Sequence, residues 1–305
     1  MLVLGDSAAV GYGMHRADAT PAAMIGLGLV HLMDAPVEVR TRAVVGAQTS
    51  DLMGQLDQVA DWEPHVAVII VGTNDVTHQV RPSTSARTLG DVVRRLVAAD
   101  CEVVVGTTPD LGSVRPIKQP LRAVARQLSR SLARKQTIAV VEAGGRAVSL
   151  GGLLGNLFTE KRDIMFGVDR FHPSETGYAN MVSVIIPAVA ASLREKSRTY
   201  EYAGYAPSNT PRDLMSVRDA AAEAVQNPGT EVVQEKAQGG GRSGHSPAAP
   251  SRPLTCPPSP ETQKRRWPIP EGTGHRRCFR WVLVLSRCRA GLRGYAGARY
   301  TARRE

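Results

Sequence analysis

The chain has 305 residues, with 38 basic and 28 acidic side chains, a formal net charge of +10 and a pI near 9.8. Residues 239–305 hold 14 of the basic and 3 of the acidic residues, which leaves 24 basic and 25 acidic residues in the remainder. The excess positive charge belongs to the C-terminal end, and this distribution argues against a basic body that coats nucleic acid.

The remaining composition excludes several other classes of protein. No uninterrupted apolar stretch approaches the ~18–20 residues that span a bilayer, and no basic N-terminal region leads into an apolar stretch, so we expect no signal peptide. The four cysteines, of which Cys101 alone lies before residue 239, form no CxxC pair and predict neither a disulfide framework nor a zinc site. A cytoplasmic location is the default expectation. Met1 stands only six residues before Ser7, however, and a segment upstream of this short first strand could carry an export signal.

Strands and helices alternate along the first 195 residues. In chain order the pattern predicts strand Leu2–Gly5, strand Val37–Val44, helix Thr49–Asp61, strand Val66–Gly72, helix Ser85–Asp100, strand Glu102–Thr107, helix Pro120–Gln136, strand Thr137–Glu142 and helix Ser174–Glu195. Ser174 is the predicted N-cap of the last helix, and Pro187 is expected to bend it. Strands separated by helices of this length favour a parallel sheet that is covered on both faces.

The composition divides the chain into three parts. Residues 1–198 are expected to form one catalytic domain, and residues 199–238 a peripheral segment with a short helix within Arg212–Val225. Residues 239–305 contain 8 prolines and 9 glycines without sustained periodicity. We expect this tail to be disordered, and a misassigned gene end is an alternative explanation of its composition.

Three separated segments carry the residue types that acyl transfer requires. Gly5–Ser7 follows the first strand and places a serine at a strand-to-helix turn, where backbone N–H groups can face the group it attacks. Asn74 follows a buried strand and can donate its side-chain amide to an oxyanion. Asp169 stands three residues before His172, a spacing at which a carboxylate can orient the imidazole and leave Nε2 as a base. Taken alone, each has a structural alternative: a cap serine, a polar turn and a surface Asp–His contact.

Together and in this order, the segments resemble the SGNH (GDSL-type) hydrolase superfamily, whose four short blocks carry a Ser, a Gly, an Asn and a His. The matching blocks are Gly5–Ser7 with Gly11, Gly46 within Val45–Thr49, Gly72–Asp75, and Asp169 with His172. The resemblance covers about residues 1–195. It implies a three-layer αβα sandwich around a central parallel sheet, the flavodoxin-like arrangement of that superfamily, in a single catalytic domain.

The resemblance also implies a role for each matched residue. Ser7 would be the nucleophile, and His172 and Asp169 would complete a catalytic triad. The backbone N–H groups of Ser7 and Gly46 and the side-chain amide of Asn74 would form the oxyanion hole. The sequence predicts no cofactor and no metal, because it has neither a P-loop nor a histidine or acidic cluster with metal-ligand spacing.

The leading hypothesis is therefore a serine esterase that acts on a small-molecule ester. Short acyl chains are favoured because no long apolar lid insertion is present, and the loops Val76–Ser83 and Gly144–Val168 are expected to form much of the pocket wall. One alternative keeps the same site for O-deacetylation of, or acyl transfer to, a carbohydrate. A second alternative is an interaction protein that uses its basic tail. We expect neither a nucleic acid nor a membrane to be required, and the oligomeric state is not predicted.

Overall fold

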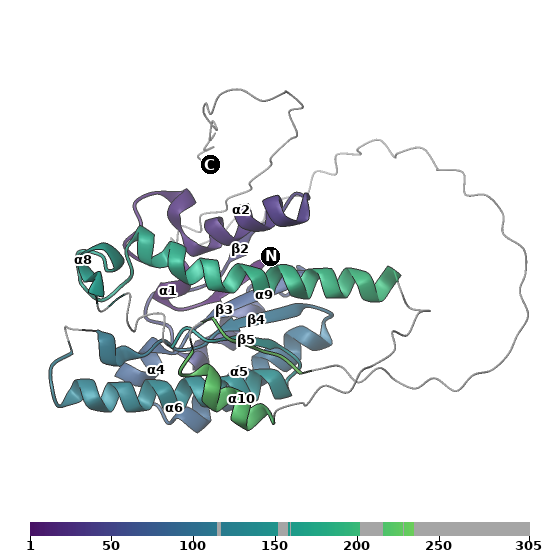
Figure 1. The fold of residues 1–305 in the computed structure, drawn as a ribbon. Coiled ribbons are helices and arrows are strands. Elements are labelled where there is room, and N and C mark those ends of the chain that lie inside the picture. The colour runs from purple at the N-terminus through teal and green to yellow at the C-terminus, as the bar shows by residue number, and fades with distance from the viewer. Residues whose placement is uncertain (115–116, 152–157, 159, 202–215, 228, 235–305) are drawn as a thin grey trace, which may run out of the picture.

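The structure, a computed structural model, describes residues 1–234 except 115–116, 152–157, 159, 202–215 and 228 (Figure 1). Its central sheet has six strands in the order β2-β1-β3-β4-β5-β6. In chain order they are β1 Leu2–Gly5, β2 Arg40–Thr41, β3 Val66–Ile70, β4 Glu102–Gly106, β5 Arg146–Val148 and β6 Glu231–Val232. The first five strands pair in parallel and β6 runs antiparallel to β5, so the predicted α/β class with a mostly parallel sheet is confirmed.

Helices cover both faces of this sheet, as Figure 1 shows. One face, which includes Val3 and Val68, packs against α2 Pro21–Met33 and α9 Glu175–Glu201. The opposite face, which includes Leu4 and Ile69, packs against α3 Leu52–Asp57, α5 Pro82–Ala98, α6 Leu121–Glu142 and α10 Val217–Ala224. Neighbouring residues of a strand point to opposite faces, so apolar runs such as Val66–Ile70 supply both halves of the core.

Short helical turns follow the strands at their carboxyl ends. They are α1 Ser7–Val10 after β1, α4 Thr73–Thr77 after β3, and the 3₁₀ turns Thr49–Asp51 after β2 and Leu111–Ser113 after β4. A further 3₁₀ turn, Ala17–Ala19, precedes α2, and α8 Arg162–Met165 precedes α9. In a parallel sheet these carboxyl ends share one edge, which brings the polar segments of the sequence together.

The predicted strand Thr137–Glu142 is wrong, because these residues form the last turns of α6. Their apolar side chains are buried at helical spacing, with Val140 and Val141 facing the core that lies against α5. A short apolar run rich in β-branched residues does not by itself distinguish a strand from a buried helix end. The fifth strand instead begins at Arg146, after a reversal at Gly144, whose φ is +88°.

Other boundaries also differ from the predictions. The predicted strand Val37–Val44 is reduced to the two residues of β2, and the predicted helix Thr49–Asp61 divides into a 3₁₀ turn and the short α3. The helix α2 was not predicted. Apart from His31 it consists of apolar residues and glycines, so no polar face reveals the periodicity that marks an amphipathic helix.

The last long helix, α9, begins as predicted. The Ser174 Oγ accepts a hydrogen bond from the Gly177 N–H at 3.1 Å, which confirms the N-cap, and Pro187 lies within the helix. The stretch Glu175–Ser197 is long and apolar enough to cross a membrane by length and composition, although no membrane span was predicted. Half of its most apolar 18-residue window is buried in the protein, and the helix covers one face of the sheet.

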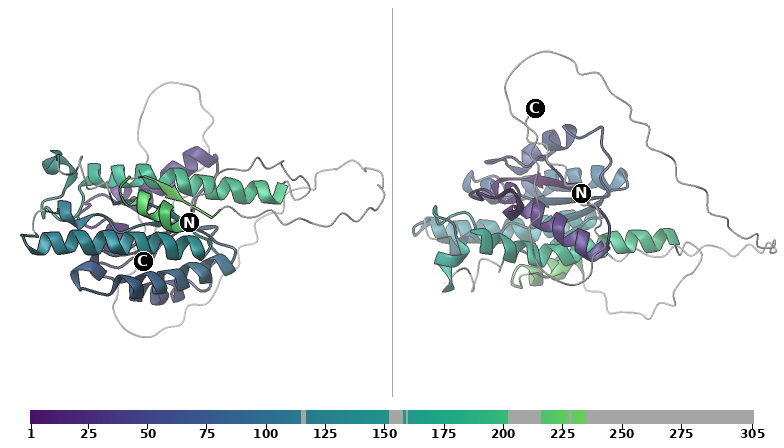
Figure 2. Two further views of the ribbon diagram at one scale, coloured as in Figure 1. Left: turned by 60° about the horizontal axis from the view of Figure 1, so that its bottom comes forward. Right: turned by 90° about the horizontal axis from the view of Figure 1, so that it is seen from above.

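Two elements beyond residue 215, α10 and β6, lie against the rest of the fold (Figure 2). The predicted short helix is present as α10, and β6, which was not predicted, adds an edge strand beside β5. Arg146 of β5 is buried and forms ion pairs with Glu195 of α9 and with Glu231 of β6, the latter at 2.7 Å. The contact with Glu231 ties β6 to β5, and the contact with Glu195 ties α9 to the same strand. The predictions for residues 239–305 lie outside the described residues.

Candidate active site

Ser7 begins helix α1 directly after the central strand β1. Asp6 is the N-cap of this helix, and its side chain accepts the Ala8 N–H at 2.9 Å. Ser7 is only 6% exposed, yet its Oγ lies in a pocket at the carboxyl edge of the sheet. The strand-to-helix turn therefore presents the serine hydroxyl from a rigid position.

The turn before Ser7 requires a glycine and is supported by a distant glutamine. Gly5 has a φ of +136°, and a Cβ at this position would lie 1.9 Å from the Ile70 carbonyl oxygen. The Gln55 side chain of α3 accepts the Gly5 N–H and donates to the Gly5 carbonyl, both at 2.9 Å. These contacts fix the backbone immediately ahead of the serine.

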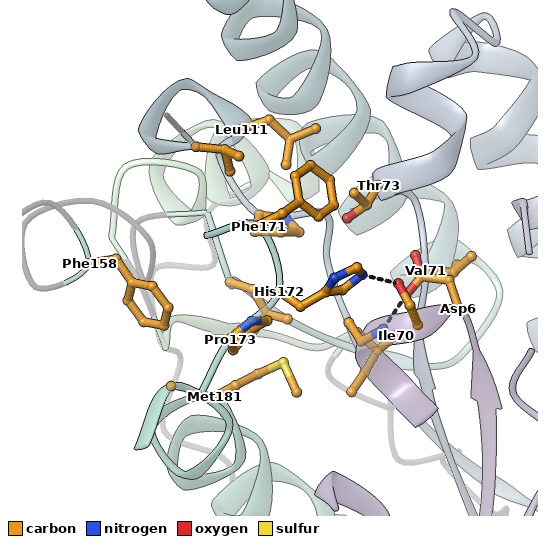
Figure 3. A pocket seen from close by; sticks show the side chains of 16 residues that line it. Asp6, Ile70, Val71, Thr73, Leu111, Phe158, Phe171, His172, Pro173 and Met181 are labelled. Atoms are coloured by element: carbon orange, nitrogen blue, oxygen red, sulfur yellow. Dashed lines mark hydrogen bonds between the residues drawn. The ribbon is translucent and has the colours of Figure 1, made fainter. Parts of the chain in front are cut away.

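His172 lies beside Ser7 although the two residues are 165 positions apart (Figure 3). The His172 Nε2 is 3.0 Å from the Ser7 Oγ, and its Nδ1 is 2.6 Å from the Asp169 Oδ2. Hydroxyl, imidazole and carboxylate thus form a continuous hydrogen-bonded line. In this arrangement the imidazole can remove the serine proton through Nε2, while the carboxylate holds the imidazole in the tautomer with a basic Nε2.

The loop that carries these residues is organised by Asp169. The second carboxylate oxygen, Oδ1, accepts the backbone N–H groups of Phe171 at 2.9 Å and His172 at 3.0 Å, across a turn in which Arg170 has a φ of +56°. Burial acts to raise the pKa of Asp169, but the hydrogen bonds from the His172 ring and the two N–H groups outweigh it and lower the pKa. Asp169 therefore remains ionised and can orient the imidazole.

Asp6 joins the serine turn to the loop after β3. Its carboxylate is 1% exposed and also accepts the backbone N–H groups of Gly72 and Thr73. Burial raises the pKa of Asp6 to about 6, against the opposing effect of these hydrogen bonds, and the nearby charge of Asp75 raises it further. Asp6 thus holds two of the four sequence blocks together.

Asp75 links the blocks after β2 and β3 in the same way. Its Oδ2 accepts the Thr49 N–H at 3.0 Å, and its Oδ1 accepts the Ser85 hydroxyl at 2.6 Å. The neighbouring Asn74 donates one amide N–H to the Ala47 carbonyl at 2.9 Å. An amide has two N–H donors, so this bond orients the Asn74 side chain and leaves it a second donor.

Gly46 occupies the turn that Asn74 contacts. Its φ is +84°, and a Cβ at this position would meet no atom within 4 Å, so the glycine borders open space. The Val44 N–H donates to the Gly5 carbonyl at 3.0 Å, and Ala47 accepts the Asn74 amide, so the turn is held on both sides of Gly46. The structure thus brings Ser7, His172 and Asp169 into direct contact and attaches the segments of Gly46 and Asn74 to the same sheet edge.

An apolar pocket adjoins Ser7 and His172 (Figure 3). Its apolar side chains come mainly from the strand ends and from the loops after β4 and β5: Ile70, Val71, Leu111, Val114, Leu150, Phe158, Phe171 and Met181. The predicted loop Gly144–Val168 contributes Leu150 and Phe158 to this wall, whereas no side chain of Val76–Ser83 is among the described lining residues. Val76 instead packs into the core beside Leu111.

Some residues of the site were missed by the sequence analysis. Gln55 contacts the serine turn, and Tyr12 and Phe171 contact the imidazole. Gln55 and Tyr12 lie outside the polar motifs, and Phe171 lies between Asp169 and His172 but was given no role. Tyr178, fully buried at the start of α9, donates its hydroxyl to the Tyr12 carbonyl at 3.1 Å. Among the residues that the structure describes, no group of three or more His, Cys, Asp or Glu side chains could hold a metal ion.

The chain is similar to a known protein family and to a known esterase. The model of the GDSL-like Lipase/Acylhydrolase family matches residues 3–179. The chain is 41% identical over 198 residues to the GDSL-like esterase Rv1075c of Mycobacterium tuberculosis, and the match covers 64% of this chain and 63% of that protein, so less than two thirds of the relative's length is spanned.

Solved structures share the fold at lower identity. The crystal structure of TesA has a TM-score of 0.50 at 17% identity, and the match covers 64% of this chain and 97% of that chain. The lipase/acylhydrolase from Enterococcus faecalis has a TM-score of 0.50 at 20% identity, with 62% and 95% covered. Both similarities cover nearly the whole of the compared chain, as expected for one shared domain.

Proposed function

The chain belongs to the GDSL-like lipase/acylhydrolase family, and from this premise we propose that it hydrolyses carboxylic esters with Ser7 as the nucleophile. The observation that carries the proposal is the hydrogen-bonded line from Ser7 Oγ through the His172 ring to the Asp169 carboxylate, at 3.0 and 2.6 Å. In this proposal His172 is the general base and acid, and Asp169 orients it.

The proposed reaction proceeds in two halves. His172 Nε2 takes the proton of Ser7 as its Oγ attacks the ester carbonyl, and then gives that proton to the leaving alcohol oxygen as the C–O bond breaks. A water molecule next attacks the acyl-enzyme while His172 accepts its proton, and the returned proton releases Ser7 and the carboxylic acid.

The oxyanion of each tetrahedral intermediate would be bound by the Ser7 N–H, the Gly46 N–H and the Asn74 amide. The positive φ and open surroundings of Gly46 support this assignment, because they leave its backbone accessible to a substrate oxygen. The bond from Asn74 to Ala47 supports it as well, since it fixes the orientation of the amide before substrate arrives.

We assign the acyl group to the apolar pocket beside Ser7. Apart from Asp6, Ser7, Thr73 and His172 its lining side chains are apolar, so it suits the hydrocarbon part of an ester better than a charged alcohol. Short acyl chains remain the expected substrates. Turnover of p-nitrophenyl esters from acetate to laurate measures this preference, and rising kcat/KM up to laurate would contradict it.

The triad assignment is tested by substitution and by labelling. Ser7→Ala and His172→Ala are expected to abolish turnover of p-nitrophenyl butyrate, and Ser7→Ala to abolish labelling by a fluorophosphonate probe. The controls Ser183→Ala and His31→Ala alter exposed residues of α9 and α2 and should keep full activity. Undiminished turnover in either triad variant would refute the assignment.

The same assay separates hydrolysis from acyl transfer. With an added sugar or alcohol acceptor, a hydrolase releases acid at an unchanged rate, whereas a transferase forms a new ester in its place. Predominant formation of acylated acceptor would replace hydrolysis with transfer as the function of this site.

A further inference from the structure

Tyr12 lies against the imidazole of His172 from outside the pocket. The two ring centroids are 4.5 Å apart with an interplanar angle of 46°, and Tyr12 is 46% exposed. The imidazole also contacts Phe171, with ring centroids 5.1 Å apart and an interplanar angle of 71°. Phe171 lines the pocket, whereas Tyr12 is not among the described lining residues. The imidazole therefore contacts two aromatic rings, one that lines the pocket and one that is half-exposed.

The backbone of Tyr12 is fixed at both its polar groups. Its N–H donates to the Ser7 carbonyl at 3.0 Å, and its carbonyl accepts the Tyr178 hydroxyl at 3.1 Å. Burial raises the pKa of the Tyr178 phenol, so Tyr178 stays protonated and remains a donor. Tyr12 is thus tied to the serine turn on one side and to α9, which follows His172, on the other.

The chain reversal that returns Tyr12 to the site depends on Gly11. This residue has a φ of +79°, and a Cβ there would lie 2.6 Å from the Pro21 Cδ. The reversal therefore has a defined backbone geometry. A half-exposed aromatic ring on a fixed backbone, in contact with the imidazole, is placed to act on that ring.

We propose that Tyr12 is a positioning residue for His172. The ring of Tyr12 restrains the imidazole beside Ser7 and stabilises the imidazolium that protonates the leaving alcohol. The inference rests on the proposed hydrolase function. The physical basis is twofold: the Tyr12 ring, 4.5 Å away and tilted by 46°, shields part of the imidazole from water, and the quadrupole of this ring attracts the cation that forms when Ser7 gives up its proton.

This role predicts a dependence on the leaving group. Nitrophenolate departs readily without a proton, so its esters need His172 only as a base. An alkoxide must be protonated as it departs, so alkyl esters also need the imidazolium in position as an acid. Loss of the Tyr12 ring is therefore expected to impair alkyl esters more than nitrophenyl esters.

The test compares Tyr12→Leu and Tyr12→Phe in the full chain, using kcat/KM for p-nitrophenyl butyrate and ethyl butyrate. Tyr12→Phe should remain within about two-fold of the parent on both esters, because it keeps the ring. Tyr12→Leu should lose roughly two- to five-fold on the nitrophenyl ester and roughly ten- to thirty-fold on the ethyl ester, the range expected for one cation–π contact.

Two further variants keep the test independent of folding. Tyr178→Phe retains the Tyr12 ring but frees its carbonyl, and should show a smaller loss with the same preference between esters. Leu121→Ala removes an exposed side chain at the start of α6 and should affect neither ester. Fluorophosphonate titration counts the folded active sites in each preparation, so that kcat/KM is expressed per active serine.

The outcomes distinguish this inference from the proposed function. Equal losses on both esters in Tyr12→Leu, or no loss on either, would overturn the role of Tyr12 while leaving the triad intact. Full activity in Ser7→Ala would overturn the proposed function itself.

Discussion

Asp6 and Asp169 are both carboxylates of the site, yet their surroundings shift their pKa values in opposite directions. Asp169 is 42% exposed at its side chain and receives three hydrogen bonds, which lower its pKa despite partial burial. Asp6 is almost fully buried, and burial raises its pKa to about 6 although it also accepts three N–H groups. At the residue scale, one carboxylate suits a charged partner for His172 and the other a structural acceptor.

The raised pKa of Asp6 predicts a pH-dependent stability. Below about pH 4 Asp6 is protonated in both the folded and the unfolded protein. Between pH 4 and 6 the unfolded chain loses this proton while the folded chain keeps it. The free energy of unfolding therefore falls across this window, by roughly 3 kcal/mol at most, and changes no further above it. In Asp6→Asn this contribution is absent.

Urea unfolding at pH 4, 5, 6 and 7 measures this effect in the parent and in Asp6→Asn. The variant is expected to be less stable overall at low pH, because an amide replaces an acceptor that serves three N–H groups. The difference between the two proteins should then shrink as the pH rises to 6. A constant difference across the series would contradict the assignment.

Asn74 carries a second residue-scale prediction. If its amide binds the oxyanion, Asn74→Ala should lower kcat by about 10²–10³-fold with a small change in KM, because the donor acts mainly in the transition state. The matched variant Thr77→Ala alters a neighbouring exposed residue of α4 and should keep kcat. A rise in KM alone would assign Asn74 to substrate binding instead.

The sequence predicts the polar residues of the site far better than its supporting residues. Ser7 and Asn74 stand in short motifs at strand ends, where the fold class alone brings them to one edge, and His172 stands in a short motif just before the last long helix. Gln55 and Tyr12 lie in ordinary sequence, and only the packing of α3 and α9 against the serine turn reveals their contacts. Supporting contacts of this kind arise from tertiary structure, which no local pattern encodes.

At the scale of elements, the loop after β3 depends on a glycine. Gly72 has a φ of +130°, and a Cβ there would lie 2.0 Å from the Thr108 Oγ1. This hydroxyl also approaches the Gln136 side chain of α6 at 2.9 Å, so the neighbouring strand end and helix cannot readily move away. The loop that carries Asn74 is thus packed tightly between β4 and α6.

Gly72→Ala is therefore expected to destabilise the protein by about 2–4 kcal/mol, from backbone strain and overpacking together. It should also lower kcat/KM, because Asn74 follows two residues later. Thermal and urea unfolding measure the loss of stability. Gly54→Ala is the matched control, since Gly54 lies in α3 with a helical backbone and no atom within 4 Å of a Cβ, and it should be neutral or stabilising. Equal behaviour of the two variants would contradict the prediction.

The elements that could be predicted are those with an unambiguous pattern. The continuous apolar run of β3 predicts a buried strand, and the amphipathic spacing of α5 predicts a helix. The end of α6 does not, because Thr137–Glu142 has strand-like composition, and α6 continues through it since Val140 and Val141 extend the face that packs on the sheet. Two-residue strands such as β2 and β6 are formed by pairing, and their own sequences carry too little signal to predict them.

At the scale of the whole molecule, the pI near 9.8 results from the excess of basic residues in 239–305, so it gives little information about the site. The family match ends at residue 179, but packing continues beyond it, since α10 and β6 bury Ala221, Ala224 and Val232. We propose that the catalytic domain extends through β6 and does not end near residue 198.

Two truncations test this boundary. A chain ending at Gln234 should retain the kcat/KM and melting temperature of the full chain, because it keeps α10 and β6. A chain ending at Arg198 should lose roughly 2–4 kcal/mol of stability, because the buried Arg146 loses Glu231 and an edge of the sheet is uncovered. Equal stability of the two truncated chains would place the boundary before α10.

The double hydrogen bond between Gln55 and Gly5 has a consequence for variation of this fold. The Gly5 carbonyl also accepts the Val44 N–H, so the serine turn is bound both to α3 and to the 42–48 segment, which carries Gly46. A change in the length of that segment should therefore displace the serine turn and Gly46 together. Variation of substrate preference in this fold is expected instead among the apolar side chains that line the pocket.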